Sequence, residues 1–195
     1  IDPSTGAESS EVGQFFIDEV GPNPWVMDLA IDPTTNLLWG LDYQRGIVKI
    51  NKNTAEVTLV GALPVGIQEG AGIAITPDGK LYAAQSDGNT VFWELSKTDA
   101  SIVNTIAFSP AGTQSAAGLG ARPSDGLLFA NERKGAGGKL YTIDPATGVV
   151  TVIGTPSEAL SDVAFFVRVV PILPGGAFGS LLLASLLVAV GFYAV

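Results

Sequence analysis

The chain has 195 residues, of which 47% are hydrophobic and 15% charged, with a formal net charge of −9. It contains no cysteine and no histidine, which excludes disulfides, CxxC sites and catalytic sites of the Ser-His-Asp or Cys-His kind. The acidic balance excludes nucleic acid as a natural partner, because such a surface repels a phosphate backbone. Twenty-four glycines and twelve prolines indicate many turns and predict an all-β fold.

The first segment of the chain is half of a repeat. Residues 1–7, IDPSTGA, and residues 10–20, SEVGQFFIDEV, match the second half of LYTIDPATGVVTVIG at residues 140–154. We therefore expect a strand end, a turn and an outer strand here, without the two inner strands that should precede them.

Three longer segments share one pattern of an apolar strand, a proline-containing turn and a second apolar strand. Pro33, Pro77 and Pro123, which mark the turns, are 44 and 46 residues apart. The segments are MDLAIDPTTNLLWGLD (27–42), AGIAITPDGKLYAAQ (71–85) and AGLGARPSDGLLFAN (117–131).

Each of these is followed by a second hairpin in which apolar and polar residues alternate. The hairpins are GIVKINKNTAEVTLVG (46–61), TVFWELSKTDASIVNTI (90–106) and KLYTIDPATGVVTVIG (139–154). Four strands in 44 to 46 residues are typical of one blade of a β-propeller. A three-layered solenoid is the alternative, but the coils of β-helices have much shorter periods.

A fourth blade begins at LSDVAFFVRVV, residues 160–170, where Asp162 aligns with Asp28 of the first repeat. It has no outer strands of its own, and the N-terminal segment supplies the matching half. We predict an all-β fold in residues 1–170, a small propeller of about four blades whose last blade is closed by the N-terminal segment. The alternative is that more blades precede Ile1.

The C-terminal segment, residues 171–195, is predicted to be a transmembrane helix. No residue from Val169 to Val195 is charged. A helix that starts near Pro174 and runs to Val195 has 22 residues and spans about 33 Å, enough for the hydrocarbon core of a bilayer. A buried core helix is the weaker alternative. Small residues, which let another membrane helix approach closely, are predicted to form one packing face, although they are also simply common in such helices: Gly176, Ser180, Ala184 and Gly191.

Carboxylates are the remaining candidates for chemistry. Asp28 and Asp162 occupy equivalent positions on inner strands, where the other two repeats have Gly72 and Gly118. If both face a central channel, they could bind a hard cation such as Ca²⁺. The alternative is that each accepts backbone N–H groups at a blade junction. No residue is assigned as catalytic, cofactor-binding or metal-binding, and no cofactor is expected.

Two further features are expected to be structural. The segment SKTD, Ser96–Asp99, is predicted to be a hairpin turn and not a catalytic motif. Trp25 and Trp93 could be contact points, but core packing is the preferred interpretation.

The motifs LYTIDPATGVVTVIG, IDPTTNLLWGLD and ITPDGKLYAAQ resemble the repeats of secreted bacterial propellers of the YVTN, NHL and related superfamily. This resemblance implies a propeller and leaves the function open. The tail VPILPGGAFGSLLLASLLVAVGFYAV is similar to the C-terminal anchors of exported bacterial surface proteins, without their final basic cluster.

Three functions remain open. The preferred hypothesis is a non-enzymatic, single-pass membrane protein with an extracytoplasmic propeller. It acts as a scaffold or accessory subunit of a larger membrane complex, for which a photosynthetic or respiratory complex fits. Its expected partners are other subunits and the lipid bilayer. The alternatives are an independent cell-surface binding protein and, less favoured, a propeller enzyme with a central metal.

Overall fold

The computed structural model describes residues 5, 7, 11–13, 16–17, 21–22, 25–67, 72–86, 88–132, 138–157, 160, 162–166 and 185–186. In these residues the fold consists of three four-stranded antiparallel sheets and two short strand pairs, with no helix. The first sheet contains β3 (Val26–Ile31), β4 (Leu38–Asp42), β5 (Gly46–Ile50) and β6 (Val57–Gly61).

The second and third sheets repeat this order. The second contains β7 (Gly72–Ile75), β8 (Leu81–Ala84), β9 (Val91–Leu95) and β10 (Ile102–Ala107). The third contains β11 (Gly118–Ala121), β12 (Leu128–Asn131), β13 (Leu140–Ile143) and β14 (Val150–Gly154).

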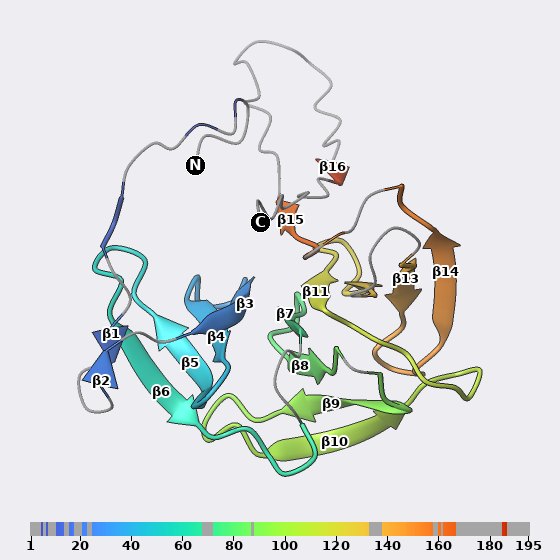
Figure 1. Cartoon of the computed structure of the whole chain (residues 1–195), viewed down its shortest axis with the longest axis horizontal. Helices are drawn as coiled ribbons and strands as arrows, with labels where there is room; N and C mark the ends of the chain where they lie inside the picture. The colour runs from blue at the N-terminus through green and yellow to red at the C-terminus, as the bar shows by residue number, and fades with distance from the viewer. Residues whose placement is uncertain are drawn as a thin grey trace, which may run out of the picture.

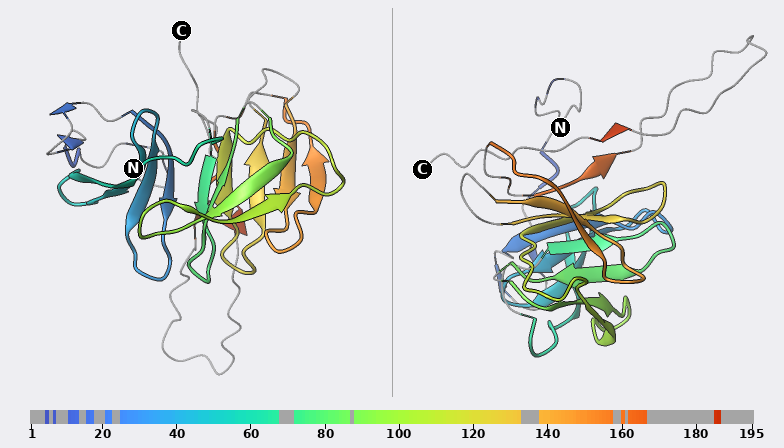
Figure 2. Two further views of the ribbon diagram at one scale, coloured as in Figure 1. Left: turned by 90° about the horizontal axis from the view of Figure 1, so that it is seen from below. Right: turned by 90° about the vertical axis from the view of Figure 1, so that its right-hand side faces the viewer.

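The three sheets radiate from a common centre. In each sheet the spatial order of the strands is their order in the chain, so that β3, β7 and β11 lie innermost and β6, β10 and β14 outermost (Figure 1). The two further views show the sheets standing side by side around this centre (Figure 2). The strands and their order confirm the hairpin pattern expected from the repeats.

Most hairpins use one turn of five residues. In each, the N–H of the fifth residue donates to the carbonyl of the first at 2.7 to 3.0 Å, and the fifth residue has φ between 59° and 76°. Asparagine or glycine accepts this conformation readily, whereas Ala55 and Ala100 occupy it with their methyl groups buried. The five turns span residues 32–36, 51–55, 96–100, 122–126 and 144–148. The turn at 96–100 confirms the structural interpretation of SKTD.

The core lies between neighbouring sheets. Trp39 and Leu41 of the first sheet pack with Ile73, Leu81 and Trp93 of the second. A second cluster joins the second sheet to the third, and its largest members are Tyr82, Phe92, Phe108, Leu128 and Tyr141. These residues come from strands far apart in the chain, so burial of apolar surface holds the sheets to one another.

The segment after the third sheet returns to the centre. Phe165, in β15 (Phe165–Phe166), packs edge-on against Phe129 of β12, with ring centroids 4.9 Å apart. Val163 is buried, and its carbonyl lies against Gly120 of β11. This is the place that the repeat alignment gives to the first strand of a fourth blade.

The N-terminal segment lies elsewhere than predicted. β1 (Phe16–Ile17) pairs with β2 (Gly21–Pro22) and lies beside β6, the outer strand of the first sheet (Figure 1). β15 pairs instead with β16 (Ser185–Leu186). In the described residues the N-terminal segment therefore does not close the last blade. It folds back on itself, and two-residue strands carry too little sequence information to fix their partner.

The predicted transmembrane helix, residues 171–195, lies outside the described residues apart from Ser185–Leu186 of β16. The packing face predicted for Gly176, Ser180, Ala184 and Gly191 also lies outside them. In the part of the chain that the structure describes, no helix is long and apolar enough to cross a membrane.

Candidate functional site

Asp28 and Asp162 meet at the centre of the three sheets. Asp28 lies in β3 and is only 3% exposed. Its Oδ1 accepts the N–H of Leu29 at 2.8 Å, and its Oδ2 accepts the N–H of Ile73, in β7 of the second sheet, at 2.6 Å. This carboxyl group therefore joins two neighbouring inner strands.

Asp162 approaches from the other side, immediately before β15. Its Oδ1 accepts the N–H of Val163 at 2.6 Å, and its carboxyl group lies close enough to that of Asp28 for the two to interact electrostatically. Burial, together with the negative charge of Asp162, raises the pKa of Asp28 well above its usual value of 3.8. Burial also raises the pKa of Asp162, because a carboxylate loses its hydration in the interior.

Both interpretations of this pair find support in the geometry. The two side chains converge at the centre, as the cation hypothesis requires. Each also accepts a backbone N–H group, as the alternative requires, Asp28 from Ile73 of the neighbouring inner strand and Asp162 from the next residue, Val163. No ion pair in the described residues involves either carboxyl group, and no cluster there brings together three side chains of the acidic, histidine or cysteine type for a metal ion.

Glycine at the two other equivalent positions makes room for the pair. A Cβ at Gly118 would lie 2.5 Å from Oδ1 of Asp162 and 2.8 Å from Oδ1 of Asn131. A Cβ at Gly72 would lie 2.9 Å from the backbone N of Leu119. All three distances are too short for real contacts, so the inner strands approach the centre closely only because these residues have no side chain.

Asn131 is a member of the centre that sequence reasoning missed. It ends β12, is 1% exposed, and its Nδ2 donates to the carbonyl of Leu160 at 2.6 Å. Its Oδ1 has no hydrogen-bond partner. The repeats did contain a signal. Asp42 and Asn131 end the second strands of their sheets, Gln85 directly follows the second strand of its sheet, and all three are buried polar residues.

A second buried carboxylate, Asp32, links the first two sheets. It accepts hydrogen bonds from the backbone N and Oγ1 of Thr34. Lys97, in the turn between β9 and β10, places its Nζ 2.8 Å from Oδ2 of Asp32. Burial disfavours the charge of Asp32, but these hydrogen bonds outweigh it and lower the pKa of the carboxyl well below 3.8.

An aromatic pair, of which one ring is exposed, lies at the edge of the first sheet. Trp25 is 60% exposed, and its ring is tilted against that of Tyr43 with centroids 4.9 Å apart. The core position expected for Trp25 is wrong, because this residue precedes β3 and packs on the β4–β5 turn, where no sheet of the described residues faces it. Trp93, expected in the core as well, is buried there.

A pocket of about 450 Å³ adjoins Tyr43. It lies between the β4–β5 turn, which contributes Tyr43, Gln44 and Arg45, and the connection after β6, which contributes Ala62, Leu63 and Ile67. Val65, in the same connection, is fully exposed. We call Trp25, Tyr43, Arg45, Leu63 and Val65 the aromatic surface.

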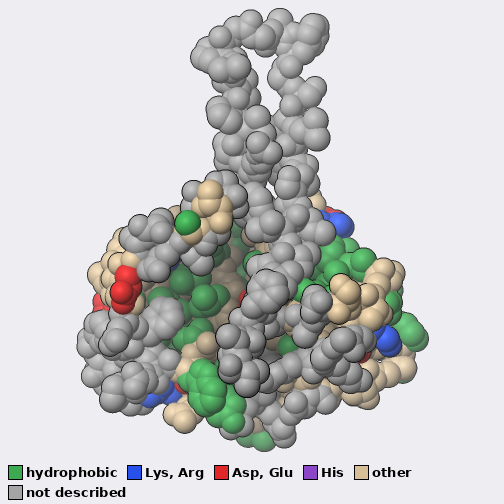
Figure 3. All heavy atoms as spheres, turned by 45° about the horizontal axis from the view of Figure 1, so that its top comes forward, with side chains coloured by type: hydrophobic (Ala, Val, Ile, Leu, Met, Phe, Trp, Pro, Cys, Tyr) green, Lys and Arg blue, Asp and Glu red, His purple; other side chains and the backbone are tan. Residues whose placement is uncertain are grey.

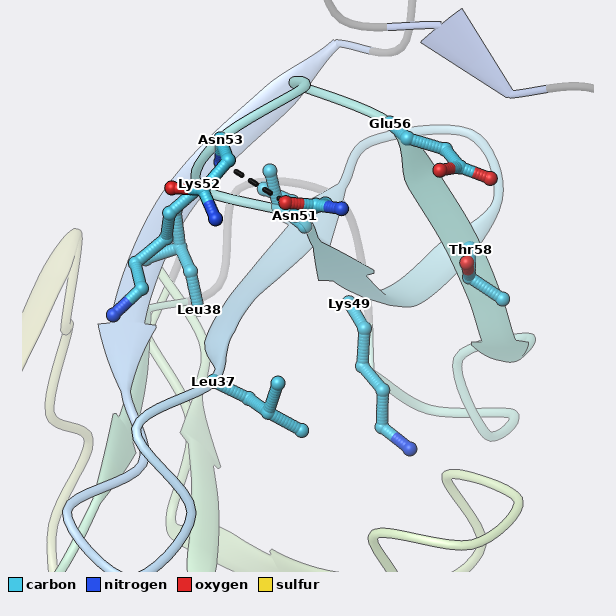
Figure 4. Close-up of a pocket in the computed structure, with 9 residues that line it drawn as sticks. Leu37, Leu38, Lys49, Asn51, Lys52, Asn53, Glu56 and Thr58 are labelled. Carbon is cyan, nitrogen blue, oxygen red and sulfur yellow. Dashed lines mark hydrogen bonds between the residues drawn. The ribbon is translucent and has the colours of Figure 1, made fainter.

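The opposite ends of the first-sheet strands form another pocket, of about 370 Å³. Figure 4 shows its lining, with Lys49 extending from β5 between Leu37 and Thr58. Lys49 stacks over the ring of Trp39 at 4.9 Å, and Lys52 binds Oδ1 of Asn36 at 2.8 Å. Since its lysines already have partners in the fold, this pocket is a weaker candidate.

Hydrophobic side chains are also exposed along the outer strands. Figure 3 shows some of them on the side of the third sheet, at the right of the view. The exposed hydrophobic residues of the outer strands include Val103 in β10 of the second sheet and Val152 and Ile153 in β14 of the third. Single exposed residues of this kind are common in proteins, whereas a stacked Trp–Tyr pair beside a pocket is a more specific feature.

Solved structures share the arrangement of the sheets. The chain is similar to hydrazine synthase of Kuenenia stuttgartiensis (TM-score 0.50, 16% identity over 81% of this chain and 42% of that one). It is also similar to an auxiliary nutrient binding protein of Bacteroides thetaiotaomicron (TM-score 0.53, 18% identity over 76% of this chain and 35% of that one). The WD40 repeats of RRP9 are similar as well (TM-score 0.51, 13% identity over 74% of this chain and 43% of that one).

These likenesses extend to the fold alone and identify it as propeller-like. The chain spans less than half the length of each of these three structures. No curated protein sequence matches it.

In sequence, residues 7–166 match the family described as a repeat of unknown function, DUF6923. This match covers all three sheets and the return segment around Asp162. The chain therefore belongs to the DUF6923 repeat family.

Proposed function

We propose that the chain is a non-enzymatic binding domain that serves as a scaffold or accessory subunit of a membrane assembly. In this proposal the propeller-like domain lies outside the cytoplasm, and residues 171–195 anchor it as a single transmembrane helix. Its partners are other subunits, which it contacts through the aromatic surface and through the membrane helix.

The aromatic surface is the observation that carries this proposal. Tryptophan, tyrosine and arginine are the residues most enriched among those that dominate the free energy of protein–protein binding. Here Tyr43 and Arg45 line one pocket, and the exposed ring of Trp25 packs on that of Tyr43. Arg45 is held in place by Asp42, whose Oδ1 accepts its backbone N–H at 2.8 Å and whose Oδ2 lies 3.3 Å from its guanidinium.

The chemistry of the chain supports binding over catalysis. It has no histidine or cysteine to serve as base or nucleophile. The carboxyl pair at the centre is engaged by backbone N–H groups of three inner segments, and Asp28 is too buried to meet a substrate. One of the solved structures with a similar fold is a nutrient binding protein, which is in line with a binding role.

Purification of the tagged full chain from membranes of its own organism, in mild detergent, tests the proposal. We expect stoichiometric partner subunits with the wild type and loss of at least one of them with Trp25→Ala. Val103→Ala is the matched control, since Val103 is equally exposed, at 60%, but lies on β10, away from the aromatic surface. A monodisperse single chain in the membrane fraction contradicts the subunit role and favours an independent surface binding protein. Recovery of the untreated chain in the aqueous fraction contradicts the anchor.

A further inference from the structure

We propose that the centre of the sheets is a cation site, in which Asp28, Asp162 and Asn131 bind Ca²⁺ or a similarly hard, oxygen-preferring ion. Nothing in the proposed binding function requires this site. It is argued from three groups that converge there, namely two carboxyl groups and one side-chain amide oxygen. Carboxylate and amide oxygens are the ligands that Ca²⁺ takes in proteins.

The buried oxygen Oδ1 of Asn131 has no hydrogen-bond partner among the described residues. Because Nδ2 of this side chain donates to the carbonyl of Leu160 at 2.6 Å, the orientation of the amide is fixed and Oδ1 must point the other way. In that direction it approaches Gly118, on the same side as Oδ1 of Asp162. A buried acceptor without a donor is unfavourable, and a cation beside Asp162 satisfies it.

The charge of the Asp28–Asp162 pair also favours a bound cation. Two carboxylates in contact repel each other unless a proton or a cation neutralises part of their charge, and in the described part of the chain no lysine or arginine forms an ion pair with either of them. A shared proton would neutralise part of this charge but would offer nothing to Asn131. A cation between the three side chains would meet both requirements.

Two glycines let the inner strands approach the centre closely. The equivalent positions on the two neighbouring inner strands are Gly72 and Gly118, and a Cβ on either would collide with the strand or side chain opposite. At Gly118 the colliding atoms are the Cα and Oδ1 of Asp162 and the Oδ1 of Asn131. The absence of a side chain there leaves these oxygens free to face the same point. Water would supply the remaining ligands of the ion.

The experiment uses the full chain after treatment with a chelator and its removal, in buffer of physiological ionic strength near neutral pH. Calorimetric titration with CaCl₂ alone is expected to show one saturable site. The dissociation constant expected is about 10⁻⁴ to 10⁻³ M, as in extracellular calcium modules. At a Ca²⁺ concentration about ten times the dissociation constant, we expect Tm to rise by about 3 to 6 °C.

Variants locate the ion. Asp162→Asn keeps the shape of the side chain and removes one charge, so binding should weaken at least about tenfold. Asp125→Asn is the matched control, because Asp125 is an exposed aspartate paired with Arg122, and it should bind Ca²⁺ like the wild type. Equal loss in both variants would mean general attraction to an acidic surface and would overturn the proposal.

The wild type alone decides the matter if Asp162→Asn does not fold. Equilibrium dialysis against Ca²⁺ is then expected to give one bound ion per chain. Less than about a tenth of an equivalent at 10 mM Ca²⁺, a concentration well above the constants of known modules, leaves the pair with a shared proton only and refutes the cation site.

Discussion

Replacing Lys97 with methionine tests how the first two sheets are held together. Lys97 lies in the β9–β10 turn, and its Nζ is 2.8 Å from Oδ2 of Asp32 in the β3–β4 turn. The Asp32 side chain is 1% exposed and that of Lys97 29% exposed. Lys97→Met keeps most of the apolar stem and removes the charge, so it isolates the ion pair between neighbouring sheets.

The expected cost follows from the burial of Asp32. Removing one partner of a fully buried ion pair typically costs about 3 to 5 kcal/mol, because the other charge is left uncompensated. Asp32 keeps its hydrogen bonds from Thr34, and water can reach the position that Lys97 vacates, so we expect a loss of about 2 to 3 kcal/mol in the free energy of unfolding near pH 7. For a chain of this size that corresponds to a fall in Tm of about 4 to 12 °C.

The stabilisation from the Lys97–Asp32 pair should decrease at low pH. The pKa of Asp32 is lower in the folded chain than the usual 3.8, so the unfolded chain binds more protons below about pH 4. The stabilisation from the pair is complete above the unfolded pKa and is lost as the pH falls through the folded one. Urea denaturation of wild type and Lys97→Met should therefore differ most near pH 7, and the difference should shrink between about pH 4 and pH 2.

Lys52 provides the control. It occupies another hairpin turn, where its Nζ binds the neutral Oδ1 of Asn36 at 2.8 Å on the surface. Lys52→Met should change the free energy of unfolding by less than about 0.5 kcal/mol. If Lys97→Met is equally mild near pH 7, or if its effect is the same at all pH values, the pair does not hold the sheets together and the reasoning is refuted.

Two further substitutions test the core and the centre. Phe92 is fully buried and stacks on Phe108 with centroids 5.3 Å apart; Phe92→Ala should cost about 3 to 5 kcal/mol in urea denaturation, and a cost below about 1 kcal/mol would contradict this packing. Gly118→Ala places a methyl group against Asp162 and Asn131. This substitution should lower the free energy of unfolding by about 1 to 3 kcal/mol. At Gly66 a Cβ would meet nothing within 4 Å, so Gly66→Ala measures only the cost of a side chain at the positive φ of 101°.

The hairpins could be predicted because their information is local. In LYTIDPATGVVTVIG, residues 140–154, the alternation of apolar residues fixes which side of the strand is buried. Asp144 then caps the turn by accepting the N–H of Ala146 at 2.8 Å, and Gly148 takes φ of 72°. Each of these features acts within a few residues, so one sequence is enough to detect them.

The N-terminal strand and Trp25 could not be predicted in the same way. β1 is only two residues long, and its position beside β6 depends on a surface assembled from other parts of the chain. Trp25 is a large hydrophobic residue of the kind found in cores, but its burial depends on whether another sheet packs against the first sheet at β3. Hydrophobicity alone does not determine that.

The carboxyl pair was accessible to sequence reasoning because a ring of repeats places equivalent inner-strand residues at the centre. The repeats did not show that the contact between the two aspartates depends on the glycines at the other two equivalent positions. Asp28 and Asp162 can meet only while Gly72 and Gly118 allow the strands between them to approach. A side chain at either glycine would separate the two carboxyl groups from each other and from Asn131. The four positions therefore act as one unit, in which two residues supply oxygen atoms and two supply the space for them.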